Sequence, residues 1–229
     1  MENPWLTFNP DKDAPKFHDL DKAHAQGFNK GLEGSNEYTL AEHLEPYPYL
    51  GNPNANIFVL LANPGISKRQ TDPSFRINPE NVNRNQKNLR HESADSFLSW
   101  LHSPDNPEME SEWLIPRIRK VVHETSLERV SSGLFLINFH PYNSKSWYPI
   151  PFTFETQRYS FHLVREAMIR NALIIMSRNK LGWFTAIPGL YDYKNRVMFK
   201  SSRSVHMSEK NLGTDVYKLL LMRLSDLDT

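Results

Sequence analysis

Three short polar segments of the sequence combine residue types that could carry out chemistry. They cover residues 63–67, 138–143 and 201–213, and each follows a hydrophobic run. Their amides, imidazoles and hydroxyls can orient a water molecule, donate a hydrogen bond to a developing negative charge, or hold phosphate oxygens. Such chemistry depends on exact positioning, so the elements that place the three segments decide what they can do.

The composition excludes several classes of site. The 229 residues include no cysteine, which rules out disulfides, thiolate zinc sites, iron–sulfur clusters and a cysteine nucleophile. No group of His, Asp and Glu has the spacing of metal ligands, and the Gly-x-Ser-x-Gly, P-loop and His-Glu-x-x-His motifs are absent. We therefore expect neither a metal nor a cofactor, and these absences weigh against a small-molecule hydrolase at the same segments.

Size and hydropathy indicate a folded protein away from membranes. With 39% hydrophobic residues, the chain is suited to one α/β domain. The longest apolar run, residues 57–62, is too short to span a bilayer, and residues 1–5 lack the regions of a signal peptide. We expect a cytoplasmic monomer with no membrane contact.

The charge is divided unevenly along the chain, although its net value is only +1. Residues 1–114 hold 10 Lys and Arg against 17 Asp and Glu, whereas residues 115–229 hold 17 against 9. One interpretation is a basic surface that faces phosphate. The other is that the charges of the two halves meet and cancel in the fold.

Alternating strands and helices must position the three polar segments. Continuous apolar runs predict strands over residues 56–61, 133–138, 172–176 and 196–200. Helices are expected over residues 19–30, 94–101, 112–122, 154–171 and 215–224, with a loop or a loosely helical lid over 66–92 and an extended segment over 45–53. This order predicts a mostly parallel sheet with right-handed crossovers. Because sites in such sheets lie beyond the carboxyl ends of the strands, the three segments should meet on one rim.

The motifs within these segments resemble those of the uracil-DNA glycosylase superfamily. In family order they stand at Asn63-Pro64-Gly65, Leu136-Ile137-Asn138 and His206-Met207-Ser208. The resemblance covers roughly residues 45–225. The chain departs from the family pattern at Ala62, where Gly is frequent, and at Met207, where Pro is usual. Its lack of cysteine also separates it from the iron–sulfur members.

The resemblance implies both a fold and an activity. The fold would be an α/β three-layer sandwich with a central, mostly parallel four-stranded sheet. A single domain would cover residues 1–229, with residues 1–44 as an N-terminal extension packed on it. The activity would be that of a monofunctional DNA glycosylase, which flips a base out of DNA and hydrolyses its N-glycosidic bond. The alternative is a non-catalytic module on the same fold that binds nucleic acid or senses a base.

Two residues take catalytic roles under this resemblance. Asn63 would orient the attacking water through its amide oxygen, but it cannot accept a proton as a carboxylate would, which favours bases that leave readily. His206 would donate a hydrogen bond to the departing base, where negative charge develops. Alternatively, Asn63 only supports the turn that follows it, and His206 is a surface histidine.

Four residues would contact the flipped base: Gly65, Phe75, Asn138 and His140. Asn138 offers a donor and an acceptor to the base edge, or it caps a strand end. Phe75 would stack on the base or pack in the core, and His140 would line the pocket or form a turn. Uracil-specific relatives carry Tyr where this chain has Gly65, so an open 5-position implies mismatched or 5-substituted pyrimidines. Some bacterial glycosylases of this kind remove modified cytosines of phage DNA as a defence.

The remaining contacts would go to the DNA backbone and stack. The residues expected there are Ser67, Arg203, Ser208, Lys210, Asn211 and Leu212. Ser208 would grip a phosphate, and Leu212 or Met207 would fill the gap left by the flipped base.

Overall fold

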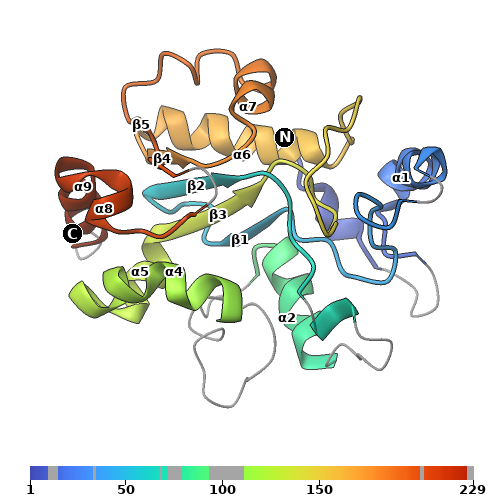
Figure 1. The fold of residues 1–229 in the computed structure, drawn as a ribbon, viewed down its shortest axis with the longest axis horizontal. Coiled ribbons are helices and arrows are strands. Elements are labelled where there is room, and N and C mark those ends of the chain that lie inside the picture. Colours follow the sequence, from blue (N-terminus) through green and yellow to red (C-terminus); the bar gives the residue numbers. More distant parts are fainter. Residues whose placement is uncertain are drawn as a thin grey trace.

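A twisted sheet forms the centre of the molecule (Figure 1). The computed structural model describes residues 1–9, 15–32, 35–67, 69–71, 79–92, 111–201 and 204–225. The sheet has five strands in the order β1-β3-β2-β4-β5. They are β1 (Tyr49–Gly51), β2 (Ile57–Leu61), β3 (Leu134–Asn138), β4 (Leu173–Met176) and β5 (Arg196–Met198).

The four predicted strands are confirmed, but the predicted four-stranded sheet is wrong because a fifth strand makes it mixed. Strands β2, β3, β4 and β5 run parallel, whereas β1 pairs antiparallel with β3, placing Tyr49 opposite Ile137. The sequence predicted an extended backbone here, but three residues among prolines carry no signal of their pairing partner. Gly51 is required at this edge, since its φ is 110° and a Cβ would lie 2.5 Å from the Leu134 carbonyl oxygen.

Helices cover both faces of the sheet (Figure 1). On one side lie α6 (Gln157–Ile169) and α7 (Lys180–Ala186), and on the other lie α4 (Ser111–Glu124), α5 (Leu127–Gly133) and α9 (Thr214–Ser225). The others are α1 (Asp19–Gly31), α2 (Pro79–Leu89), the one-turn α8 (Glu209–Leu212) and the 3₁₀ turns η1 (Pro4–Thr7) and η2 (Arg69–Thr71). None of the described helices is long and apolar enough to cross a membrane.

Most predicted helices are confirmed within a few residues of their expected ends, and the differences fall on short or polar segments. The region expected to be a loop or lid contains the regular helix α2, whose three buried asparagines face the edge of the sheet. Two of them, Asn85 and Asn88, donate to the carbonyls of Pro46 and Tyr49. Helices α5, α7 and α8 were not predicted, because four to seven residues give too little periodicity. The helix expected at 94–101 lies outside the described residues.

Side chains alternate between the two faces of the central strand β2. Phe58 and Leu60 belong to the buried cluster that includes residues of α6 and α7. Ile57, Val59 and Leu61 belong to the cluster that includes residues of α4, α5 and α9. Burial on both faces explains why this strand is a continuous apolar run rather than an alternating one.

The N-terminal region is tied to the rest by a buried carboxylate. Asp21, in the first turn of α1, accepts hydrogen bonds from the Tyr142 hydroxyl (2.7 Å) and from the hydroxyl and backbone N–H of Thr156 (2.5 and 3.3 Å). Asp21 and Thr156 are fully buried. Tyr142 lies in the loop after β3, so Asp21 fixes that loop and the start of α6 against α1.

We predict that Asp21→Ala lowers the free energy of unfolding by about 2–4 kcal/mol, because it leaves buried donors without their charged acceptor. Urea denaturation followed by circular dichroism measures the change. Asp19→Ala is the matched control, since this exposed acid of the same first turn contributes only about 0.3–1 kcal/mol through the helix dipole. Equal losses in the two variants would contradict the role of Asp21.

Candidate functional site

The loops after β2 and β3 meet at the carboxyl ends of these strands, and we call this meeting place the Asn63 crevice. The chain passes from β2 to β3 with α4 and α5 on one face of the sheet, and from β3 to β4 through α6 on the other (Figure 1). Ligands of α/β proteins usually bind outside the carboxyl ends of the strands. Asn63 and Asn138 stand at these two strand ends.

Asn63 is held in the crevice by its amide nitrogen. The Nδ2 group donates to the Ser144 hydroxyl (2.8 Å), the Ser144 carbonyl (3.4 Å) and the Pro64 carbonyl (3.2 Å). The Ser144 hydroxyl in turn donates to the Ser146 carbonyl (3.0 Å), which fixes its lone pairs toward Asn63. No described residue donates to the Asn63 Oδ1, and the side chain is half-buried. The amide oxygen is therefore a fixed acceptor.

Backbone hydrogen bonds join the loops after β2 and β3. The His140 N–H donates to the Ala62 carbonyl (3.0 Å), and the Ser144 N–H donates to the Pro64 carbonyl (3.2 Å). The structure thus brings together the first two predicted segments. Asn63, Asn138 and His140 share this end of the sheet.

Gly65 leaves open space beside Asn63. Gly65 is exposed and its φ is not positive. No heavy atom lies within 4 Å of the position that a Cβ added to Gly65 would take. The backbone therefore does not require glycine here. Ser67, two residues on, is engaged locally, because its hydroxyl accepts from the Gln70 N–H (3.2 Å) while its own N–H donates to the Gln70 side chain (2.8 Å).

Asn138 ends β3 with one half of its amide engaged. Its Nδ2 donates to the Tyr47 carbonyl (2.8 Å), which is the strand-end capping considered for this residue. Its Oδ1 is buried without a hydrogen-bond partner in the described part of the chain. In this conformation only the acceptor half of the Asn138 amide remains for a ligand.

His140 lies in an aromatic box and is 3% exposed. Its ring stacks on Trp147 with centroids 4.7 Å apart and meets Phe139 and Phe154 edge-on. Neither ring nitrogen has a hydrogen-bond partner among the described residues. Burial lowers the pKa of His140 to about 3, and the nearby Gln157 side chain opposes that shift only partly, so the imidazole is neutral.

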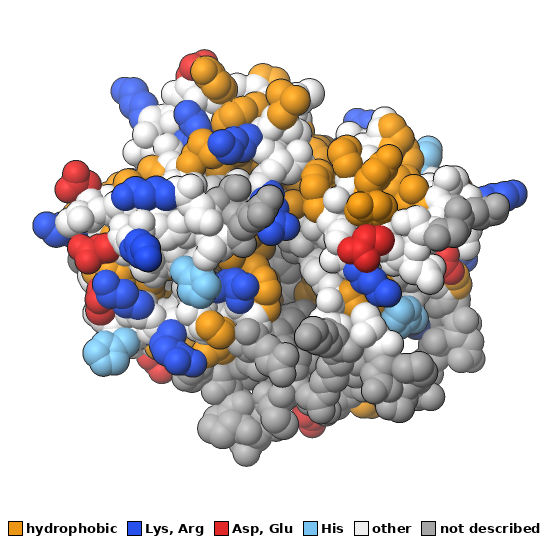
Figure 2. Space-filling model, viewed as in Figure 1, with side chains coloured by type: hydrophobic (Ala, Val, Ile, Leu, Met, Phe, Trp, Pro, Cys, Tyr) orange, Lys and Arg blue, Asp and Glu red, His pale blue; other side chains and the backbone are white. Residues whose placement is uncertain are grey.

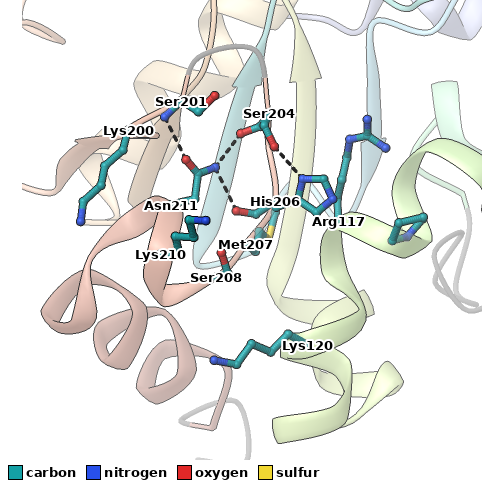
Figure 3. A pocket seen from close by; sticks show the side chains of 11 residues that line it. Arg117, Lys120, Lys200, Ser201, Ser204, His206, Met207, Ser208, Lys210 and Asn211 are labelled. Carbon is teal, nitrogen blue, oxygen red and sulfur yellow. Dashed lines mark hydrogen bonds between the residues drawn. The ribbon is translucent and has the colours of Figure 1, made fainter.

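A separate pocket of about 540 Å³ opens between α4 and the segment after β5 (Figure 3). Its lining contains His206 and four cationic side chains, those of Arg117, Lys120, Lys200 and Lys210. Figure 2 shows many Lys and Arg side chains on the side of the molecule that carries α8 and α9. Among the described residues, none from the loops after β2 and β3 lines this pocket. The structure therefore does not bring His206 into contact with the Asn63 crevice.

Asn211 organises the wall of this pocket (Figure 3). Its Oδ1 accepts from the Ser201 N–H (2.9 Å), and its Nδ2 donates to the carbonyls of Ser204 (2.5 Å) and His206 (3.1 Å). The His206 Nδ1 lies 2.6 Å from the Ser204 hydroxyl, which directs the other ring nitrogen outward. Asn211, predicted to bind DNA, is thus committed to holding the loop and is buried.

The other predicted DNA contacts are divided between surface and core. Ser208 and Lys210 line the pocket. Leu212 and Met207 are buried in the cluster that contains α4, α5 and α9, so neither is placed to enter a base stack unless this segment rearranges. Phe75 and Arg203 lie outside the described residues.

Sequence reasoning missed several residues that shape these two regions, among them Lys200, which was assigned only to the fourth predicted strand. Ser144 and Trp147 follow the second motif, and a polar, aromatic continuation of that loop was their signal. Arg117 and Lys120 stand three residues apart in α4, a spacing that puts them on one helix face. What the spacing could not show is which segment that face meets.

No family profile matches the sequence, and no curated protein or solved structure is significantly similar to it. Within the described residues, no three His, Asp or Glu side chains gather closely enough to hold a metal ion. The function must therefore be inferred from the crevice and the pocket themselves.

We predict that His140 makes the protein less stable as the pH falls below 6.5. Its folded pKa is depressed, so below the unfolded pKa of about 6.5 the unfolded chain binds the extra proton, and stability declines by about 1 kcal/mol between pH 7.5 and 5.5. Glu45 acts in the opposite direction, because burial raises its pKa to about 6 and its stabilising protonation is lost above that value.

Urea midpoints of the native protein and of His140→Phe at the two pH values isolate the histidine's share. The variant should lose less stability on acidification, while His123→Phe, at an exposed position of α4, should behave as the native protein does. An unchanged pH dependence in His140→Phe would show that this imidazole is not buried in its neutral form.

Proposed function

We propose that the protein is a monofunctional DNA glycosylase of the uracil-DNA glycosylase superfamily. It flips a base out of DNA and hydrolyses the N-glycosidic bond, leaving an abasic site. Its substrate is a pyrimidine that is uracil-like, mismatched or modified at the 5-position, including hypermodified cytosine of phage DNA. In this proposal it acts as a monomer on DNA in the cytoplasm.

The observation that carries the proposal is the fixed orientation of Asn63. Three hydrogen bonds restrain its amide nitrogen, so its oxygen is a preorganised acceptor at the crevice where α/β sheets bind ligands. A water held by that oxygen would attack the sugar carbon as the bond to the base breaks. The base would leave as an anion with the bonding electron pair, and the proton shed by the water would pass to solvent or to that base. Orientation lowers the barrier without proton transfer, because effective positioning alone is worth several orders of magnitude in rate.

The neighbouring groups suit a neutral base. His140 is uncharged and ringed by aromatic side chains, and the buried Asn138 Oδ1 is an unused acceptor. Asn63 can orient the attacking water, but it has no carboxylate to accept a proton. The reaction therefore requires a base that departs readily as an anion. The resemblance gives His206 the role of stabilising that anion by a hydrogen bond, but its loop is held at the separate pocket by Asn211 and Arg117, so the proposal does not depend on His206.

A non-catalytic base-sensing module is the alternative, and the buried positions of Met207 and Leu212 favour it. Without a side chain exposed to fill the gap in the stack, a flipped base lacks one source of stabilisation. The two proposals differ in a single product, the abasic site.

We predict that Asn63→Ala slows base release by about two orders of magnitude or more while DNA affinity changes little, because only the positioning group is lost. Alkali cleavage of labelled DNA under single-turnover conditions measures the rate, and fluorescence anisotropy measures binding. Ser144→Ala should cause a smaller loss, since it removes only one of the three hydrogen bonds that hold the Asn63 amide and leaves its oxygen in place. An Asn63→Ala protein as active as the native one would remove Asn63 from the mechanism.

We predict that Gly65→Tyr narrows the substrate range without unfolding the protein. The open space around an added Cβ and the ordinary φ allow a residue other than glycine here, and in the proposed complex a tyrosine ring would occupy the place beside the pyrimidine 5-position. Release of plain uracil and of 5-substituted bases is compared in Gly65→Tyr and Gly65→Ala, together with their melting temperatures. A stably folded tyrosine variant with the native ratio of activities would place residue 65 outside the pocket.

A further inference from the structure

The pocket between α4 and residues 200–211 has an excess of positive charge. Arg117, Lys120, Lys200 and Lys210 line it, and none of the described lining residues is acidic. Neither Lys200 nor Lys210 forms an ion pair with a described residue. Such a gathering of like charges is costly unless an anion offsets it, so the pocket has the electrostatic character of an anion site.

Two of these four cations already interact with neighbouring groups of the protein. Lys120 lies 3.5 Å from Glu124 and 3.7 Å from Glu209, and its ammonium stands over the Tyr217 ring at 4.7 Å. Its charge is partly compensated. Arg117 lies over the Trp113 ring (4.5 Å) and donates from one terminal nitrogen to the Trp113 carbonyl.

The Arg117 side chain nevertheless keeps unused capacity. Its Nε is buried without a hydrogen-bond partner in the described part of the chain, and burial lowers the pKa of the guanidinium. Both observations indicate that this half-buried cation is partly desolvated at its Nε. A bound anion would repair that deficit.

The walls of the pocket are fixed in advance. Besides the three bonds made by the Asn211 side chain, the Asn211 carbonyl accepts from the Lys200 N–H (2.8 Å), and the Arg117 carbonyl accepts from the Met207 N–H (2.9 Å). The segment is thereby attached to both α8 and α4. A preformed site loses little entropy on binding, which separates it from a chance cluster of surface lysines.

The volume indicates how much of a ligand can enter. About 540 Å³ exceeds what a phosphate alone would fill and falls within the range of small-molecule sites. Pro116 and Met207 supply apolar surface, and the hydroxyls of Ser201, Ser204 and Ser208 supply hydrogen-bonding groups. This combination fits a phosphate together with the sugar that carries it.

We propose that this pocket binds a backbone phosphate and sugar of a nucleotide that flanks the target base, at a subsite distinct from the Asn63 crevice. This inference rests on the proposed function. Lys200 from the segment after β5, Lys210 from α8 and Arg117 from α4 would supply the positive charge for that phosphate. The flanking strand is thereby clamped beside the position of the flipped base.

The test compares DNA binding by the native protein and by Lys200→Gln/Lys210→Gln. Fluorescence anisotropy with single-stranded and duplex oligonucleotides is measured over a range of salt concentrations. We expect the double variant to bind about tenfold or more weakly at low salt and to show a slope against log salt that is smaller by about 1 to 2, because each phosphate contact contributes about 0.7–0.9. Lys180→Gln/Lys194→Gln removes the same charge from exposed positions outside the pocket and should bind almost as the native protein does.

Equal affinities and slopes in the two double variants would overturn the proposal. Binding of inorganic phosphate or thymidine monophosphate that is as tight as oligonucleotide binding, and that requires Lys200 and Lys210, would also overturn it, since the occupant would then be free phosphate.

Base release measured on the same samples separates this inference from the proposed function. A selective loss of DNA binding in the Lys200→Gln/Lys210→Gln variant supports the pocket assignment even if no protein releases a base. Base release with unchanged DNA affinity in that variant overturns the pocket assignment and leaves the glycosylase proposal standing.

Discussion

The hydrogen bond between the Asn63 amide and the Ser144 hydroxyl, at 2.8 Å, joins the ends of two neighbouring parallel strands, and the candidate site depends on it. It fixes the Asn63 oxygen as an acceptor and aligns the loop that carries His140. The backbone bonds from His140 and Ser144 to the Ala62 and Pro64 carbonyls extend this connection. The same loop is attached to α1 by Tyr142, whose hydroxyl donates to the buried Asp21. The N-terminal region thereby contributes to the precision of the crevice.

Two electrically different regions result from this arrangement. Around His140 the surroundings are aromatic and exclude charge, and the imidazole is neutral. Between α4 and the segment after β5 the surroundings are cationic and include fixed backbone walls. In the proposed function, the aromatic region would receive the neutral base and the cationic region the anionic backbone of the DNA.

Much of the fold could be predicted from the sequence, because the central strands are buried on both faces and read as unbroken apolar runs. Edge strand β1 was missed because its three residues gain their structure from pairing with β3, which no local pattern reveals. The short helices α7 and α8 likewise depend on tertiary contacts.

The candidate site was only partly predictable for a related reason. Motifs placed Asn63 and Asn138 at strand ends, as observed, but whether their side chains are engaged depends on distant residues such as Ser144 and Tyr47. The burial of Leu212 and the commitment of Asn211 to its own loop follow from packing against α4 and α9, which the motif does not encode. Arg117 was overlooked because its helix is far from every motif along the sequence, although in the fold its carbonyl accepts a hydrogen bond from Met207 of the third motif.

The central claim is that this crevice breaks a bond rather than only recognising a base. The most direct measurement is mass spectrometry of the small molecules released when the native protein is incubated with DNAs that carry uracil, mismatched thymine and a series of 5-modified cytosines. The account predicts free base from at least one of these DNAs, in an amount equal to the abasic sites formed. Saturating DNA binding with no free base from any of them would contradict it.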